Sequence, residues 1–284
     1  MLTNAMRIMS MQSGFALLES AFTRKNNQGS LMLKNTLDLV AGVVAYFYVG
    51  YGLAFGAPNE AGKSFAGGEL PADMNNAFWF FQFSFASTAT TINSGAIAER
   101  VNFWAYFVLS LFTCGVSYPI VVHWGWGGGW LSERGFQDFA GGMIVHGFGG
   151  VCALTACTIC GPRIGIFPQF RTWQGWRRKL CCEKRSDHFY RGPQGIEHVC
   201  FKQAQRTGNP VQMVFGMLML WIAWYSFNAG STTSLVDLAD NVASKTTVTT
   251  SFGAAGGALA TLVINPWEGL RPGPGRWHGR VVIP

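Results

Sequence analysis

Long uncharged runs recur along this chain, and each is about as long as the hydrocarbon core of a bilayer is thick. A helix needs about 20 apolar residues to cross that core. The pattern predicts seven helices, over residues 2–22, 37–56, 76–98, 101–122, 138–161, 211–230 and 246–265; the first is short, poorly defined and interrupted by Arg7. The predicted fold class is therefore all-α, a polytopic bundle of transmembrane helices.

The run from Asp138 to Gly161 is the most informative, because it carries no charge after Asp138 and holds one histidine. His146 lies eight residues beyond Asp138, which is about 12 Å along a helix and close to the midplane. An ionisable group at that depth is costly, so it should face a cavity or a partner rather than lipid. The plainer alternative is a packing helix, lined by small residues, whose histidine bonds to a neighbouring backbone. Close approach of another helix is favoured in either case by glycines 141, 142, 147, 149 and 150.

Composition supports a membrane protein. Of the 284 residues, 49% are hydrophobic and only 12% are charged, against about 25% charged in typical soluble domains. The net charge of +7 is confined to particular connections, so it sets membrane orientation and does not indicate a nucleic-acid partner. We expect no disulfide framework, because four of the seven cysteines lie in uncharged runs as buried thiols: Cys114, Cys152, Cys157 and Cys160.

The basic connections all fall on one side of the predicted topology. Arg24 and Lys25 follow the first helix, and the connection over 163–209 holds ten basic residues against three acidic ones. Cytoplasmic loops are enriched in Lys and Arg. We therefore predict an integral membrane protein, in the plasma membrane, with its N-terminus outside and the 163–209 loop in the cytoplasm. Tyr46, Tyr48 and Tyr51 are expected to anchor the second helix at the outer interface.

Three polar or aromatic residues reach the outer mouth in this topology: Trp126, Asp138 and Ser231. An indole face attracts a small cation, and a hydroxyl accepts hydrogen bonds from it. Together they predict a recruitment site for a compact cation. Two of the three have a plainer alternative: Trp126 as an interfacial anchor, and Asp138 as a helix N-cap with a favourable dipole interaction. For Asp138 we favour capping over direct ligation.

Aromatic residues indicate a gate below that site. Phe81 and Phe85 lie four residues apart on one helix face, and Phe227 lies toward the outer part of another helix. Rings stacked over His146 would exclude water and strip an ion of its hydration shell. The alternative is an ordinary aromatic core.

Several ordered motifs now indicate a family. They are MQSGFALLES at 11–20, FASTATTINSGAIAER at 85–100, HWGWGGGW at 123–130, DFAGGMIVH at 138–146 and WYSFNAGS at 224–231. Together they resemble the ammonium transporter family, the relatives of methylammonium permeases and Rhesus glycoproteins. The resemblance covers about residues 11–163 and 211–265. It favours the ammonium transporter branch, since Trp126 is retained.

The resemblance implies an outer ammonium site. Its members in this sequence are Trp126 and Ser231, with Phe85 as a second ring and Asp138 holding the site together. The ligand is then ammonium or ammonia, with methylammonium as an analogue.

The resemblance also implies a gate and a pore. Phe85 and Phe227 match the paired phenylalanines, with Phe81 one turn away, while His146 matches the first of two pore histidines and Trp224 a pore-lining tryptophan. Ammonium captured at the mouth would lose its proton, and ammonia would then pass the hydrophobic pore. Deprotonation lowers the cost of desolvating an ion. We expect no cofactor, no bound metal and no enzymatic activity.

The family is built from eleven helices in two inverted repeats. This chain is expected to hold the first repeat and the start of the second, as an incomplete domain over 1–265 that contains the basic loop, and a tail over 266–284 unlike the family. The second pore histidine has no counterpart. We therefore expect a truncated form that does not conduct by itself, and a homotrimer where the full length is present.

Three alternatives stay open. One is a membrane cytochrome with haem held by His123 and His146, although the two lie at different predicted depths. A second is a membrane sensor of ammonium that does not transport it. The third is a zinc site in the basic loop, although the spacing of its ligands matches no strong zinc-finger pattern. The candidate ligands are Cys181, Cys182, His188, His198 and Cys200.

Overall fold

The computed structural model describes residues 1–56, 75–161, 163, 209–233 and 241–264. All regular structure in these residues is helical, and they contain no strand. The predicted all-α class is therefore confirmed. The basic connection over 163–209, apart from its first and last residues, and the tail over 266–284 lie outside the described residues.

Seven long helical segments run through the described residues. Two are interrupted by a π-helical turn, and a third begins with one. The segments are α1 (Leu2–Ala21); α2 (Lys25–Ala45), continuing through the π-turn Tyr46–Gly50 into α3 (Tyr51–Phe55); α4 (Asn76–Ile97); α5 (Phe103–Phe112), continuing through Thr113–Ser117 into α6 (Tyr118–Gly125); the π-turn Gly142–Gly147 and α8 (Phe148–Cys160); α11 (Pro210–Gly230); and α12 (Val242–Ile264). The short α7 (Trp130–Glu133) follows α6.

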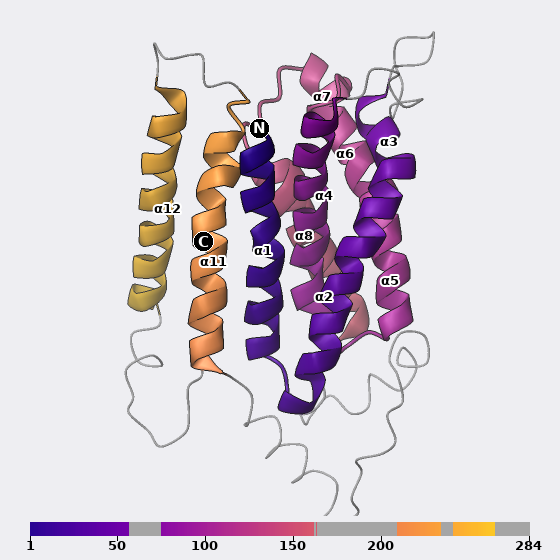
Figure 1. Ribbon diagram of the computed structural model, residues 1–284, viewed down its shortest axis with the longest axis vertical. Coiled ribbons are helices and arrows are strands. Elements are labelled where there is room, and N and C mark those ends of the chain that lie inside the picture. Colours follow the sequence, from indigo (N-terminus) through magenta and orange to yellow (C-terminus); the bar gives the residue numbers. More distant parts are fainter. Residues whose placement is uncertain (57–74, 162, 164–208, 234–240, 265–284) are drawn as a thin grey trace, which may run out of the picture.

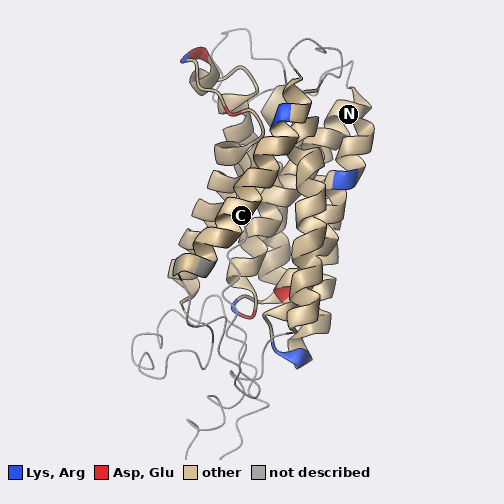
Figure 2. Ribbon diagram, turned by 90° about the vertical axis from the view of Figure 1, so that its left-hand side faces the viewer, with Lys and Arg blue, Asp and Glu red and all other residues tan. Residues whose placement is uncertain are grey.

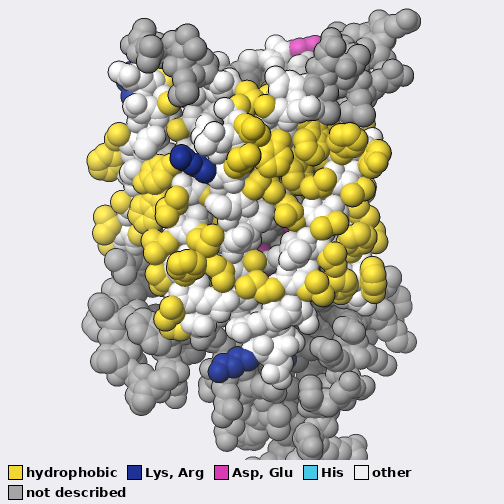
Figure 3. All heavy atoms as spheres, in the orientation of Figure 1, with side chains coloured by type: hydrophobic (Ala, Val, Ile, Leu, Met, Phe, Trp, Pro, Cys, Tyr) yellow, Lys and Arg dark blue, Asp and Glu magenta, His cyan; other side chains and the backbone are white. Residues whose placement is uncertain are grey.

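The helices stand side by side along one common direction (Figure 1). Helix α1 lies between α11 and α4 and contacts both, as well as α2, whereas α12 contacts α11 at the edge of the bundle. The middle of the bundle carries few charged residues (Figure 2), and on the face shown in Figure 3 apolar side chains form a broad band. By length and composition, four helices of the described residues can cross a membrane: Lys25–Phe55, Phe103–Glu133, Gly142–Cys160 and Pro210–Gly230.

The second helix begins earlier than predicted, at Lys25 instead of residue 37. Lys34 lies just outside the predicted helix 37–56 and Asp38 just inside it, but both side chains lie buried within the bundle, with exposed fractions of 9% and 2%. A charge satisfied by neighbouring helices does not end a helix. The prediction that three tyrosines anchor this helix at the membrane interface is also partly wrong. Tyr46 and Tyr51 are buried in the core, and only Tyr48 is exposed.

The helix that carries His146 begins at Gly142, four residues later than predicted. Gly141 before it has φ +88°, a conformation that glycine adopts without steric cost. His146 therefore lies only about 6 Å along the helix from its first residue, instead of the predicted 12 Å or so. The prediction that four cysteines are buried is correct only in part. All four cysteines in the described residues are free, but only Cys114 is buried, whereas Cys152, Cys157 and Cys160 are half-buried.

The glycines of this helix act unequally. A Cβ on Gly149 would lie 2.9 Å from Ile92 Cβ and 3.0 Å from the carbonyl oxygen of Ala89, so Gly149 permits close packing against α4. A Cβ on Gly150 would meet nothing within 4 Å. The predicted close approach of a neighbouring helix is thus confirmed at Gly149 and not at Gly150.

Arg163 fastens the end of α8 to the same end of α1 and α4. Its guanidinium donates to the carbonyl oxygens of Phe22 at 3.2 Å and Gly95 at 3.3 Å, and lies 3.9 Å from Glu99. Burial lowers the pKa of Arg163, and the Glu99 carboxylate opposes that shift. The connection that follows Arg163 therefore starts from a fixed point on the bundle.

Candidate functional site

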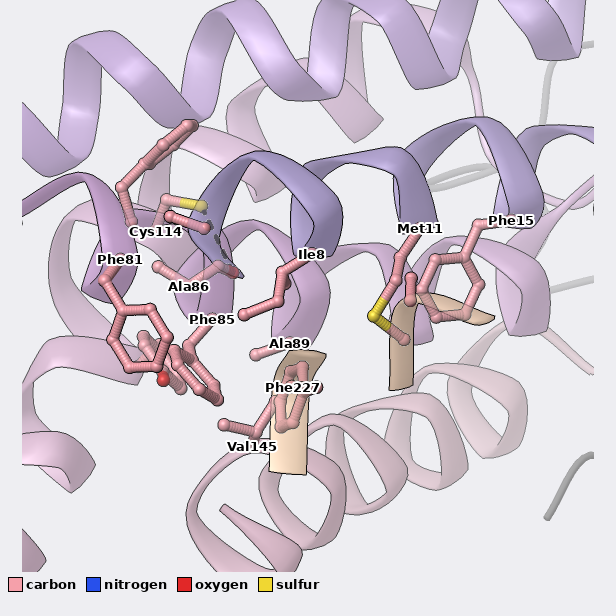
Figure 4. Close-up of a cluster of buried hydrophobic side chains, with 14 of the residues drawn as sticks. Ile8, Met11, Phe15, Phe81, Phe85, Ala86, Ala89, Cys114, Val145 and Phe227 are labelled. Atoms are coloured by element: carbon pink, nitrogen blue, oxygen red, sulfur yellow. Dashed lines mark hydrogen bonds between the residues drawn. The ribbon is translucent and has the colours of Figure 1, made fainter. Parts of the chain in front are cut away.

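Two phenylalanine rings from different helices close the centre of the site. The ring centroids of Phe85 on α4 and Phe227 on α11 are 4.2 Å apart, in an edge-to-face arrangement. Phe81, one turn before Phe85, lies 4.8 Å from it. All three are at most 2% exposed. Figure 4 shows Phe81 and Phe85 beside each other with Phe227 nearby, so the structure brings together the three residues predicted as a gate.

Trp126 lies next to these rings, at the end of α6. Its ring centroid is 5.9 Å from that of Phe85, again edge to face. The indole Nε1 donates a hydrogen bond of 2.6 Å to the backbone carbonyl of Asp138. Trp126 is therefore held in a defined orientation and contacts the aromatic gate, which a simple interfacial anchor would not require.

Asp138 caps the helix that carries His146. Its Oδ1 accepts hydrogen bonds from the backbone N–H groups of Gly141 and Gly142, and its Oδ2 from those of Met143 and Ile144, all at 2.8–2.9 Å. These groups lie at the helix start, where no intrahelical partner exists and where the helix dipole favours a negative charge. The predicted capping role is confirmed. Asp138 acts on the site by fixing this helix and, through its carbonyl, Trp126.

His146 faces the interior of the bundle. Its imidazole stacks on the indole of Trp224, with centroids 5.0 Å and planes 18° apart, and lies 5.3 Å from the ring of Phe227. Its buried Nε2 has no hydrogen-bond partner among the described residues. The histidine is thus oriented by aromatic contacts, and Nε2 remains able to donate to or accept from a small polar molecule.

Ser231 joins the site through Phe227. It directly follows α11, and its hydroxyl donates to the backbone carbonyl of Phe227 at 2.8 Å. A hydroxyl that donates one bond still offers its lone pairs as acceptors. Trp126, Phe85, Phe227, His146 and Trp224 consequently form one continuous series of ring contacts, with Ser231 attached to its centre.

The proposed haem ligation gains no support from the histidine contacts. His123 is 3% exposed, and its Nδ1 lies 3.1 Å from the backbone carbonyl of Ala54, whereas His146 is stacked on Trp224. The described residues contain no group of three His, Cys, Asp or Glu side chains that could hold a metal ion. The cysteines and histidines predicted as zinc ligands in the basic loop lie outside the described residues.

A buried polar cluster among α1, α2, α4 and α5 was missed by the sequence analysis. Glu19 of α1 forms an ion pair with Lys34 of α2 at 3.6 Å, and Asp38 lies one turn further along α2. The available signal was that Glu19 and Asp38 fall inside the predicted spans 2–22 and 37–56, and Lys34 three residues before the second. The sequence did not show that these charges belong together, whereas inside the bundle Glu19 and Lys34 neutralise each other.

The helical bundle, its apolar surface and its aromatic interior define an integral membrane protein of the polytopic α-helical class. The model of the Ammonium Transporter Family matches residues 1–175 and 192–272. The chain therefore belongs to the Ammonium Transporter Family.

Two archaeal relatives show the extent of the likeness. The chain is 36% identical to ammonium transporter Amt2 of Archaeoglobus fulgidus over 282 residues, which cover 94% of this chain and 53% of the relative. It is 35% identical to ammonium transporter Amt2 of Methanocaldococcus jannaschii over 259 residues, which cover 88% and 54%. The chain thus spans about half the length of these relatives.

Solved structures show the same fold. A protein described as a sensor Amt protein superposes with a TM-score of 0.70 and 30% sequence identity, over 93% of this chain and 60% of that one. Mep2 of Candida albicans superposes with a TM-score of 0.68 and 25% identity, over 93% and 53%.

Proposed function

We propose that this protein takes part in the transport of ammonium or ammonia across a membrane, with the aromatic series as the site of capture and passage. One observation carries the proposal: Trp126, Phe85, Phe227 and His146 follow one another in ring contact. Such a series has a cation-attracting indole at one end and an imidazole at the other. The names of the archaeal relatives support ammonium as the ligand.

Capture is assigned to Trp126, Ser231 and Phe85. Aromatic faces attract a desolvating cation by about 0.5–2 kcal/mol each, and the Ser231 oxygen supplies a hydrogen-bond acceptor. Asp138 serves as a positioning residue, because its carboxylate is engaged by four backbone N–H groups. The outer site therefore depends on Asp138 without requiring that it touch the ion.

Passage requires the loss of a charge at the gate. Phe85 and Phe227 are in contact at 4.2 Å, and an ion moving between them would lose its water with nothing but ring faces to replace it. Burying an uncompensated ammonium is far more costly than burying neutral ammonia. The proton is therefore proposed to leave before the nitrogen reaches His146, whose free Nε2 can hydrogen-bond ammonia below the rings.

The wider architecture follows the family pattern in this proposal. The seven helical segments correspond to the first inverted repeat and the beginning of the second, out of eleven spans in all. The N-terminus lies outside, the basic connection lies in the cytoplasm, and the assembled transporter is a homotrimer of the plasma membrane. Residues Trp224 and His146 line the upper pore.

The test uses the purified chain in lipid nanodiscs and radiolabelled methylammonium. Equilibrium binding is expected to fall severalfold in Trp126→Leu and to be largely kept in Trp126→Phe, which retains a ring next to Phe85 but loses the hydrogen bond to Asp138. Trp130→Leu, an exposed tryptophan on α7, is the matched control. Equal binding by Trp126→Leu and the unmodified chain would overturn the capture site.

A sensor is the second candidate, and the sensor Amt protein at a TM-score of 0.70 favours it. Both candidates share the capture site and differ in flux. Methylammonium uptake by cells that lack ammonium transporters distinguishes them when the gate is varied. Transport by this chain predicts uptake that changes in Phe227→Leu, whereas binding without any uptake in either form shows that the chain does not transport by itself and is compatible with the sensor.

A further inference from the structure

The polar cluster among α1, α2, α4 and α5 is built from other residues than the aromatic site. Its charged members, Glu19, Lys34 and Asp38, are 7%, 9% and 2% exposed. Ionisable residues inside a membrane-spanning bundle are costly and mark a functional site by default. The polar side chains around them are also buried: Gln12, Asn35, Ser87, Thr91, Ser94, Tyr106 and Ser110.

Lys34 is already engaged by Glu19. Its Nζ lies 3.6 Å from Glu19 Oε2, donates to the backbone carbonyl of Ser94 at 3.2 Å and sits 4.5 Å above the ring of Tyr106. The same Glu19 oxygen accepts from Asn35 Nδ2 at 3.2 Å and Ser94 Oγ at 2.8 Å. This pair is therefore neutral, although Glu19 Oε1 has no hydrogen-bond partner among the described residues.

Asp38 has no counterion of this kind. Its Oδ2 accepts from Thr91 Oγ1 at 2.9 Å, but its buried Oδ1 has no hydrogen-bond partner among the described residues. The hydroxyls of Tyr106 and Ser110 on α5 lie near the same carboxyl group and can donate to it, although neither has a hydrogen-bond partner of standard geometry among the described residues. Two carboxylates thus share one lysine, and one negative charge is left over at Asp38.

The hydrogen bonds around Thr91 show the same imbalance. Its hydroxyl has one proton but lies 2.9 Å from both Asp38 Oδ2 and the backbone carbonyl of Ser87. The Gln12 amide lies 2.7 Å away, and because its Nε2 has no partner among the described residues it can turn to donate to Thr91, which leaves two acceptors for one proton. If Asp38 carries a proton, it donates to Thr91 Oγ1, and the Thr91 proton is free for the Ser87 carbonyl. An alkali ion would instead neutralise the negative charge of Asp38 directly. Carboxylate, hydroxyl and carbonyl oxygens are the ligands that hard cations prefer.

We propose that Asp38 binds one monovalent cation, either a proton or an alkali ion, at a second site separate from the aromatic site. The bound cation neutralises the leftover charge, and the surrounding carboxyl and hydroxyl oxygens serve as its acceptor or ligand atoms. The titratable and charged groups that act on Asp38 are Lys34 on its own helix α2, Tyr106 on α5 and Cys114 on the following π-turn. Glu19 on α1 and Arg163 act on Lys34. The proposal does not depend on ammonium transport.

The test compares the chain with its Asp38→Asn and Glu19→Gln variants in lipid nanodiscs without ammonium. Infrared difference spectra between acidic and alkaline buffer detect the C=O stretch of a protonated carboxylic acid. Thermal unfolding in sodium chloride and in choline chloride detects an alkali ion. A carboxylic-acid band that is lost in Asp38→Asn and kept in Glu19→Gln supports a bound proton.

The alternative outcomes are equally defined. Absence of that band, together with a rise in unfolding temperature in sodium that Asp38→Asn abolishes, supports an alkali ion. If neither signal depends on Asp38, the proposal is wrong. Should Asp38→Asn fail to fold, Asp38→Glu replaces it, since a longer acid must shift the band or the sodium effect if the site is at this position.

Discussion

The imidazole of His146 and the indole of Trp224 are stacked nearly parallel, 5.0 Å apart, although they belong to different helices. The stack covers one face of the imidazole while Nε2 stays unpaired in the interior. Trp224 therefore sets the orientation of an unpaired imidazole nitrogen that can hydrogen-bond a neutral molecule beside the phenylalanine rings.

Replacing Trp224 with Leu should free His146. The leucine keeps the position apolar but removes the flat surface that holds the ring, so labelling of His146 by diethyl pyrocarbonate should rise severalfold, as measured by peptide mass spectrometry. His123, whose Nδ1 contacts the Ala54 carbonyl, provides an internal control in the same sample. Unchanged labelling of His146 would show that the stack does not restrict it.

Replacing Asp138 with Ala should destabilise the protein by about 1–3 kcal/mol. The variant leaves four N–H groups of the helix start without the acceptor they have now, and loss of a cap costs about 0.5–2 kcal/mol, with more for a charged acceptor. Asp138→Asn keeps one acceptor oxygen and should lose less. Denaturant unfolding measures both, with exposed Glu133→Gln as the control, and an Ala variant as stable as that control would contradict the cap.

Adjacent glycines on α8 offer a matched pair. Gly149→Ala places a methyl group 2.9–3.0 Å from Ile92 and the Ala89 carbonyl, and such overpacking costs about 1–3 kcal/mol. Gly150→Ala meets nothing within 4 Å and should stabilise the helix by about 0.5–1 kcal/mol. Thermal unfolding midpoints should move in opposite directions. Equal shifts would mean that α8 does not pack on α4 at Gly149.

Replacing Phe227 with Ala removes the ring that both Phe85 and His146 contact. The side chain is fully buried, and truncating a buried phenylalanine costs about 3–5 kcal/mol through lost burial and the remaining cavity. Phe252→Ala, at a residue on α12 that is 74% exposed, should change stability little in comparison. Chemical unfolding of the two variants in the same lipid checks this, and similar losses would place Phe227 outside the core.

Much of the site could be predicted from the sequence because its signals are local. The length of the apolar runs predicted the helices, the four-residue spacing of Phe81 and Phe85 placed them on one face, and an aspartate before an uncharged run predicted a cap. The family motifs then supplied the partners on other helices. These predictions succeeded because helix length, facing and capping depend on residues only a few positions apart.

The sequence by itself thus determined an all-helical membrane protein with an aromatic, histidine-containing site. Tertiary structure decided where α2 and the helix of His146 begin, which ring covers His146, and that Glu19, Lys34 and Asp38 share one buried cluster. The physical reason is that a charge beside an apolar run has the same pattern whether it meets water or a partner helix. Only the packing of α1, α2, α4 and α5 brings the neutralising groups together and keeps these charges inside the bundle.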